Sequence, residues 1–144
     1  MSVSRLIGSK SVVRRPLVLA VDDNEDNLLM LVHALELFGF ASISTLEGQA
    51  VLALAETHQP DLILLDIVMV DSNGIDIVQQ LRRNLRTEQI PIVAVTALAS
   101  VEDRRQMLDI GCNDCLSKPY DINALQVLLE HYLHPVLSAS EVAC

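Results

Sequence analysis

Short apolar runs alternate with amphipathic stretches from Leu17 to Leu133. The runs are continuous rather than alternating, which is typical of strands that are covered on both faces of a sheet. They are LVLAV at 17–21, a weaker extended stretch at 41–45, LILL at 62–65, IVAV at 92–95 and a short run at about 114–117. Each is followed by a stretch with helical spacing, so the pattern predicts five strand–helix units.

The predicted helices are recognised by apolar residues that recur at intervals of three and four. These residues are Leu28, Leu31, Val32 and Leu35 in the first helix, Val51, Leu54 and Ala55 in the second (about 47–57), Ile75, Val78 and Leu81 in the third, Val101 and Leu108 beside Arg104 in the fourth, and Ile122, Leu125, Leu128 and Leu129 in the fifth. Ser100 with Asp103 resembles a capping box, and Asp121 can cap the last helix. Gly39, Pro60-Asp61 and Gly111 are expected to end helices.

This alternation predicts an α/β domain in which helices cover both faces of a mainly parallel sheet. We assign the domain to residues 16–133, between an N-terminal arm at 1–15 and a loose tail at 134–144. The arm carries four basic residues and no acid. We interpret it as a flexible leader, with a targeting role or a contact with a partner or membrane as alternatives.

Composition excludes several classes of function. The net charge of −9 argues against a nucleic-acid-binding protein, because such proteins gather Lys and Arg on one surface. No apolar run approaches the roughly 18–20 residues that a membrane-spanning helix needs. Three cysteines are too few for a disulfide framework and favour a cytoplasmic protein. Cys112 and Cys115 have CxxC spacing, but without a second ligand pair we interpret them as packed core residues.

Polar residues with reactive side chains follow four of the predicted strands. Asp22-Asp23 follows the first strand, Asp66 the third, Thr96 the fourth, and Lys118-Pro119 the fifth. In an open parallel sheet, binding sites form beyond the carboxyl ends of the strands. We therefore expect three carboxylates, a hydroxyl and an ammonium to meet at one edge of the sheet.

Three neighbouring carboxylates repel one another unless a cation is present. Oxygen ligands without nearby His or Cys favour Mg²⁺, with Mn²⁺ as an alternative, over zinc. Such an ion leaves a position for a phosphoryl group, and a carboxylate can itself be the nucleophile. Asp66 is the best nucleophile because it stands alone, while Asp22 and Asp23 form a natural metal-holding pair. Lys118 and Thr96 can compensate charge on the phosphoryl oxygens.

Over about residues 16–133 the sequence resembles the response-regulator receiver domain of two-component signalling. The motifs are VDDNEDN at 21–27, LILLDIVM at 62–69 with Gly74 eight residues beyond Asp66, VTA at 95–97, and the segment from Gly111 to Lys118-Pro119. The resemblance implies a flavodoxin-like, doubly wound sheet of five parallel strands in the order 2-1-3-4-5. It also implies a cis peptide bond between Lys118 and Pro119.

The resemblance further implies a role for each site residue. Asp66 would be the phosphoacceptor and also a metal ligand, with Asp23 a direct Mg²⁺ ligand and Asp22 acting through water. The backbone carbonyl of Val68 would complete the protein ligands. The phosphoryl oxygens would be held by Thr96, the backbone N–H of Ala97 and Lys118.

Two positions depart from the family pattern. Val70 stands where the family commonly has Pro, which predicts a looser loop after Asp66. Cys115 stands at the switch position, where the family usually has a Tyr or Phe that moves together with the Thr. A thiol cannot fill the same space, so we expect altered coupling from the phosphate to the surface. Tyr120 is a further aromatic to which the sequence assigns no switching role.

These features predict a stand-alone response regulator that takes a phosphoryl group from a sensor histidine kinase or a histidine phosphotransfer protein. It would signal to a downstream protein target rather than act as an enzyme, because only eleven residues follow Leu133. The output face would include the fourth helix, fifth strand and fifth helix, and could also form a homodimer. Alternatives are a phosphorelay intermediate, a receiver-like binding module that takes no phosphate, and a phosphohydrolase. Adjacent acids after the first strand disfavour the hydrolase.

Overall fold

The five strands form one parallel sheet in the computed structural model, which describes residues 14–69, 72–97 and 100–133. They are β1 (Leu17–Val21), β2 (Ala41–Thr45), β3 (Leu62–Asp66), β4 (Ile92–Thr96) and β5 (Asp114–Ser117). Their order across the sheet is β2-β1-β3-β4-β5, and every neighbouring pair is parallel. The flavodoxin-like fold and the predicted strand order are therefore confirmed.

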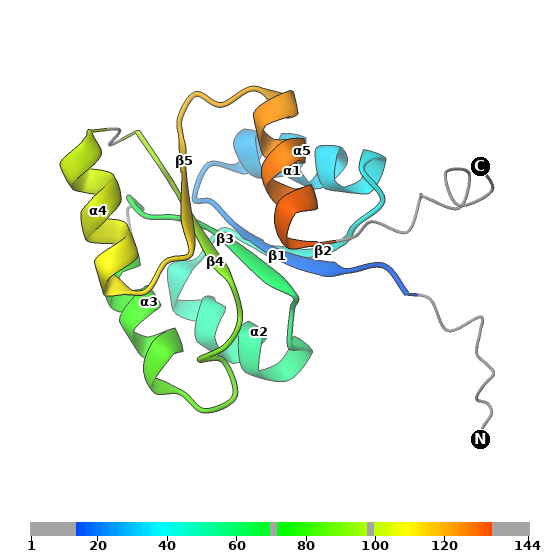
Figure 1. Cartoon of the computed structure of the whole chain (residues 1–144). Coiled ribbons are helices and arrows are strands. Elements are labelled where there is room, and N and C mark those ends of the chain that lie inside the picture. Colours follow the sequence, from blue (N-terminus) through cyan, green and yellow to red (C-terminus); the bar gives the residue numbers. More distant parts are fainter. Residues whose placement is uncertain (1–13, 70–71, 98–99, 134–144) are drawn as a thin grey trace, which may run out of the picture.

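Helices cover both faces of the sheet, as Figure 1 shows. They are α1 (Glu25–Leu37), α2 (Val51–His58) after a 3₁₀ turn η2 (Gly48–Ala50), α3 (Gly74–Arg83), α4 (Val101–Ile110) and α5 (Ile122–Tyr132). One core cluster joins the sheet to α2, α3 and α4, and the other joins it to α1 and α5. The three inner strands β1, β3 and β4 are almost completely buried, because apolar side chains project from both of their faces into the two cores. The edge strands β2 and β5 are less buried.

The ends of the helices follow the predicted capping chemistry with one exception. The Ser100 hydroxyl accepts the Asp103 N–H at 3.0 Å, and the Asp121 carboxylate accepts the Ala124 N–H at 2.6 Å. Gly111 ends α4 with a φ of 123°, which glycine adopts at low cost. The second helix ends at Gln59 in the left-handed region, with a φ of 49°, one residue before the predicted Pro60 break.

Two predicted apolar faces are less buried than their spacing indicates. In α4, Val101 and Leu108 are 76% and 50% exposed, and Met107 is the buried apolar residue of that helix. Val101 and Leu108 lie seven residues apart and so share the outer side of the helix. In α5, Ile122 is 44% exposed, because it lies in the first turn beside the site edge.

The edge of the sheet opposite the carboxyl ends is tied together by Arg82 at the end of α3. Its Nε donates to the Gly111 carbonyl at 2.9 Å, and its Nη1 donates to the Glu88 and Ile90 carbonyls at 2.9 and 2.8 Å. Its Nη2 donates to Asn113 Oδ1 at 2.9 Å. One guanidinium thus fixes the loops that enter β4 and β5.

Most of the predicted arm and all of the tail lie outside the described residues, as does Val70 in the loop after β3. Among the helices that the structure does describe, none is long and apolar enough to cross a membrane.

Candidate functional site

The predicted site residues meet at the carboxyl edge of the sheet. Val21 pairs with Leu65, Asp66 with Val95, and Thr96 with Ser117. This register places the end of each strand beside the end of the next. The Lys118 N–H donates to the Thr96 carbonyl at 2.8 Å, which holds Lys118 beside the end of β4.

Three carboxylates form the centre of this edge. One oxygen from each of Asp22, Asp23 and Asp66 lies within 4.8 Å of the others, which is close enough to hold a metal ion. Asp22 and Asp66 are only 6% and 5% exposed. Oxygen ligands of this kind suit a hard divalent cation. Sequence reasoning predicted all three members.

Local backbone contacts fix the two buried carboxylates. Asp22 Oδ1 accepts the N–H of Asn24 at 2.9 Å, and Asp66 Oδ1 accepts the N–H of Val68 at 3.2 Å. Each acid therefore turns its other oxygen toward Lys118. These hydrogen bonds restrict the rotamers of both acids before any cation binds.

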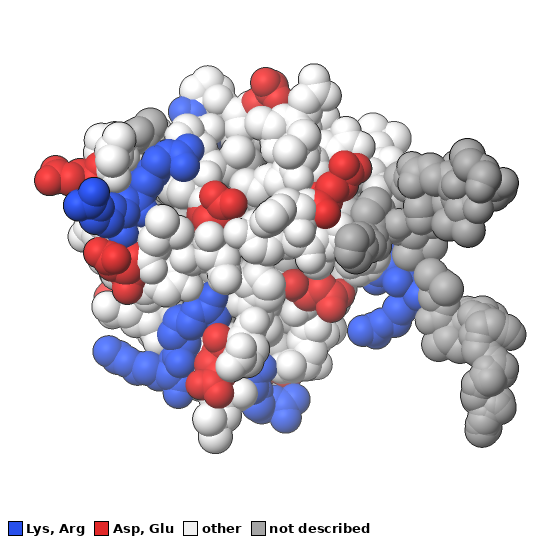
Figure 2. Space-filling view, in the orientation of Figure 1, with Lys and Arg blue, Asp and Glu red and all other residues white. Residues whose placement is uncertain are grey.

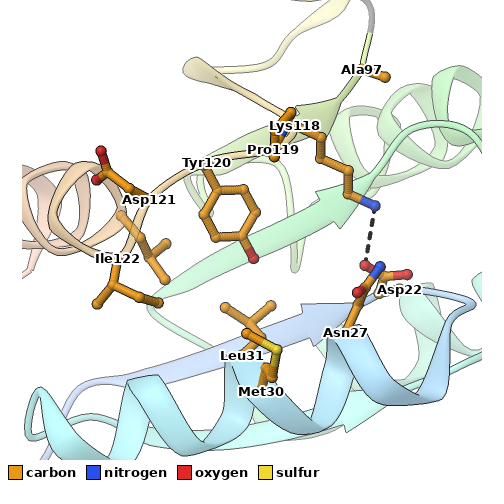
Figure 3. A pocket seen from close by; sticks show the side chains of 11 residues that line it. Asp22, Asn27, Met30, Leu31, Ala97, Lys118, Pro119, Tyr120, Asp121 and Ile122 are labelled. Atoms are coloured by element: carbon orange, nitrogen blue, oxygen red, sulfur yellow. Dashed lines mark hydrogen bonds and ion pairs between the residues drawn. The ribbon is translucent and has the colours of Figure 1, made fainter.

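Lys118 bridges two of the acids. Its Nζ lies 3.0 Å from Asp66 Oδ2 and 3.2 Å from Asp22 Oδ2, and Figure 3 shows it reaching toward Asp22 from the start of the β5–α5 loop. The ammonium neutralises one of three neighbouring negative charges and leaves the acidic group with a net negative charge. The peptide bond from Lys118 to Pro119 is cis, as the resemblance implied.

The pKa values show how burial and charge compete here. Burial raises the pKa of Asp66 above its ordinary value, and the repulsion of Asp22 adds to this, although Lys118 opposes it. Burial alone would lower the pKa of Lys118, but its hydrogen bond and charge interaction with Asp66, together with Asp22, raise that pKa. Lys118 therefore stays charged, while the ionised form of Asp66 is destabilised without a cation.

Thr96 and Ala97 follow the end of β4. Thr96 is 1% exposed, whereas Ala97 is exposed and lines a pocket together with Lys118. Val68 is 64% exposed and forms an isolated bridge with Asn73. The phosphoryl contacts of Thr96 and Ala97, and the metal contact of the Val68 carbonyl, stay predictions.

Gly74 explains how α3 can start so close to the loop that follows Asp66. Its N–H donates to the Ile67 carbonyl at 3.1 Å. A Cβ at this position would lie 2.6 Å from the Cα and carbonyl oxygen of Ile67. Only glycine permits this approach without a shift of the backbone.

Cys115 lies away from the acidic group, in the core beneath α4. It is 5% exposed and pairs in the sheet with Ala94, and it shares a core cluster with Met107 and Cys112. Burial raises the pKa of its thiol. The side chain fills core space as a small apolar residue would, in agreement with the interpretation of the two cysteines as packed residues.

A pocket beside the acidic group was not predicted from the sequence. It has a volume of about 650 Å³ and lies between α1 and the β5–α5 loop. Its lining is Asp22, Asn27, Met30, Leu31, Ala97, Lys118, Pro119, Tyr120, Asp121, Ile122 and Leu125. The available signal was Met30, an apolar residue on the outer side of α1 and 67% exposed.

Together, the fold and the site define a flavodoxin-like protein with an acidic, lysine-bridged group at the carboxyl edge of its sheet. The chain belongs to the response regulator receiver domain family, whose model matches residues 18–130. It is thus a response-regulator receiver and not a conventional enzyme.

Relatives and solved structures agree with this family. The chain is 34% identical over 116 residues to the polar-differentiation response regulator DivK of Brucella ovis and of Brucella abortus, covering 81% of this chain and 94% of those proteins. It is similar in structure to the chemotaxis response regulator CheY4 of Vibrio cholerae, with a TM-score of 0.78, 28% identity, and coverage of 83% of this chain and 100% of the other.

A second solved structure bears on the acidic group. The receiver domain of a sensor histidine kinase from Pseudomonas aeruginosa matches with a TM-score of 0.75 and 28% identity, over 83% of this chain and 98% of the other. That protein has a magnesium ion coordinated in its active-site cleft.

Proposed function

We propose that this protein is a stand-alone response regulator that accepts a phosphoryl group from a phosphohistidine onto Asp66 in a Mg²⁺-dependent reaction. The observation that carries the proposal is the group of three carboxylates with the Lys118 ammonium 3.0 Å from Asp66 Oδ2. Family membership supports a histidine kinase or a histidine phosphotransfer protein as the donor. The DivK relatives consist of little more than the matched region, which supports action without an attached output domain.

The residues of the site can each take a separate role in phosphoryl transfer. A carboxylate oxygen of Asp66 attacks phosphorus, and the bond from phosphorus to the donor's ring nitrogen breaks. The Lys118 ammonium contacts both Asp66 and Asp22, so it is already within reach of a phosphoryl oxygen on Asp66. Thr96 and the N–H of Ala97 would bind the other oxygens. These groups act by positioning and charge compensation.

The oxygen ligands of the site fit Mg²⁺, with Mn²⁺ as the alternative. We assign direct ligation to Asp23 and Asp66 and to the Val68 carbonyl, with Asp22 acting through water. The magnesium ion in the Pseudomonas receiver domain supports this assignment. When bound, the cation would neutralise charge on the acids and on the transferring phosphoryl group.

Signalling would proceed by a shift between two conformations that a target protein distinguishes. We assign the output surface to α4, β5 and α5, and the same face could pair two copies in a homodimer. Exposed Val101, Leu108 and Val127 on α4 and α5 supply apolar contacts. Figure 2 shows basic and acidic side chains together over α4, next to a largely uncharged surface over α5. The buried thiol of Cys115 lies beneath this face in place of an aromatic ring, so we infer that coupling from Thr96 differs from the family pattern. We place this activity in the cytoplasm.

Intact-mass measurement after incubation with a small acyl phosphate and Mg²⁺ tests this proposal. We expect one added phosphate on the wild-type protein, and none on Asp66→Asn or after chelation of the metal. Asp61→Asn is a matched control, since Asp61 precedes β3 and accepts the Leu17 N–H at the opposite edge of the sheet. Labelling that persists in Asp66→Asn would contradict the assignment of the phosphoacceptor.

A further inference from the structure

The pocket beside the acidic group has two kinds of wall. Asp22 and Lys118 form one end and belong to the site described above. Met30, Leu31, Ile122 and Leu125 supply apolar surface on the side of α1 and α5. An occupant that places a phosphoryl group at Asp66 could therefore rest its leaving group against apolar side chains.

Tyr120 adds a polar group to the apolar part of this pocket. Figure 3 shows its hydroxyl directed away from the β5–α5 loop and across the pocket toward α1, on the side where Asp22 and Lys118 lie. The ring is half-buried, and burial raises the pKa of its hydroxyl, so the group stays neutral. Within residues 14–69, 72–97 and 100–133, the hydroxyl makes no hydrogen bond. A tyrosine hydroxyl in such a place is available to a ligand.

The leaving group of a phosphohistidine matches both features of the pocket. Its imidazole is flat, with apolar faces, and it carries a second nitrogen that is not bonded to phosphorus. We propose that Tyr120 recognises the donor's ring, with its hydroxyl hydrogen-bonded to this second nitrogen while the ring lies against the apolar wall. This inference rests on the proposed function and names a specificity-determining residue for it.

The proton balance of the transfer shows what the hydrogen bond would do. A phosphoimidazole reacts best when its second nitrogen is protonated, because the ring then leaves as neutral imidazole. The Asp66 oxygen–phosphorus bond forms, the phosphorus–nitrogen bond breaks, and its electron pair stays on the ring nitrogen. The proton on the second nitrogen remains in place and is donated to the Tyr120 oxygen as a hydrogen bond.

Two small phosphorus–nitrogen donors separate this role from a structural one. N-phosphorylimidazole carries the ring, whereas phosphoramidate has the same kind of bond and no ring. The full chain with Mg²⁺ is labelled by each donor, and rate constants are measured by intact mass against time. Tyr120→Phe keeps the aromatic ring and removes the hydroxyl. Tyr132→Phe is the matched control, since the Tyr132 hydroxyl binds Asn113 O and Asp114 Oδ2 at 3.1 and 3.3 Å, outside this pocket.

We expect the ratio of the two rate constants, N-phosphorylimidazole over phosphoramidate, to fall roughly five- to tenfold in Tyr120→Phe, as the loss of one hydrogen bond implies. The ratio should stay within about twofold of the wild-type value in Tyr132→Phe. An unchanged ratio in Tyr120→Phe would overturn this inference and leave the proposed function intact. The same holds if the rate constants for both donors fall by the same factor, since the ratio is then also unchanged. Wild-type protein that takes phosphate from neither donor would overturn the proposed function, and the inference with it.

Discussion

Replacing Asp66 by Asn should stabilise the protein when no divalent cation is present. The side chain keeps its size and loses its charge, in a group where carboxylate oxygens lie within 4.8 Å of one another. With an effective dielectric constant of about 20, each repulsion at that distance costs about 3.5 kcal/mol. The attraction to Lys118 at 3.0 Å contributes about 5.5 kcal/mol.

Two repulsions, from Asp22 and Asp23, thus exceed one attraction by roughly 1.5 kcal/mol, and the loss of hydration of a 5% exposed carboxylate adds to the cost. The raised pKa of Asp66 has the same sign. We therefore expect Asp66→Asn to raise the free energy of unfolding by about 1–3 kcal/mol at neutral pH.

Urea unfolding with a chelator present measures this difference. Because the folded-state pKa of Asp66 is raised, its contribution to stability is fully present below the unfolded pKa and is lost as pH rises through the folded pKa. The advantage of Asp66→Asn should therefore shrink as the pH falls toward about 4. With Mg²⁺ at about 100 times its dissociation constant, the wild type should gain about 2.7 kcal/mol and the variant much less. If Asp66→Asn is less stable than the wild type in chelator at pH 7, the reasoning on charge repulsion is wrong.

Three further predictions concern other parts of the fold. Arg82→Ala should lower the free energy of unfolding by roughly 2–4 kcal/mol, because it leaves the carbonyls at the entrances of β4 and β5 without their donor. In the same urea unfolding experiment, Arg83→Ala, at the exposed neighbouring position, should lower the free energy of unfolding by less than about 0.5 kcal/mol. Ser100→Ala removes the N-cap of α4 and should cost about 1 kcal/mol, whereas Ser100→Thr keeps the hydroxyl and should retain most of this stability; equal losses would argue against the cap. Burial raises the pKa of the Cys112 thiol from 9.0 to about 11, so the thiol ionises at lower pH in the unfolded chain than in the folded one. The free energy of unfolding should therefore fall between pH 9 and 11, by up to about 1.4 kcal/mol per pH unit. A pH series on Cys112→Ala should show a flatter decline.

The strands and the acidic site could be predicted from sequence because both depend on local signals. Continuous apolar runs mark strands covered on both faces, and parallel topology forces their carboxyl ends together. Asp22, Asp66 and Lys118 each follow such a run directly. Their proximity in space follows from the order of elements, and no side-chain detail is needed.

Other features depend on how elements pack, which spacing alone does not determine. Val101 and Leu108 have helical spacing but lie on the outer side of α4, because Met107 faces the sheet. In the sequence, Arg82 is simply a charged residue near the end of a predicted helix, and only the structure shows that it binds two loops. The pocket at Tyr120 is built from α1 and the β5–α5 loop, which are about ninety residues apart in sequence.

Mapping the modified residue tests the central claim most directly. Wild-type protein would be labelled by phosphoramidate with Mg²⁺, treated with borohydride to reduce the acyl phosphate to a stable alcohol, and digested for tandem mass spectrometry. We predict that the reduced residue is Asp66 and that Asp22 and Asp23 are unmodified. Modification of another residue, with Asp66 intact, would contradict the account.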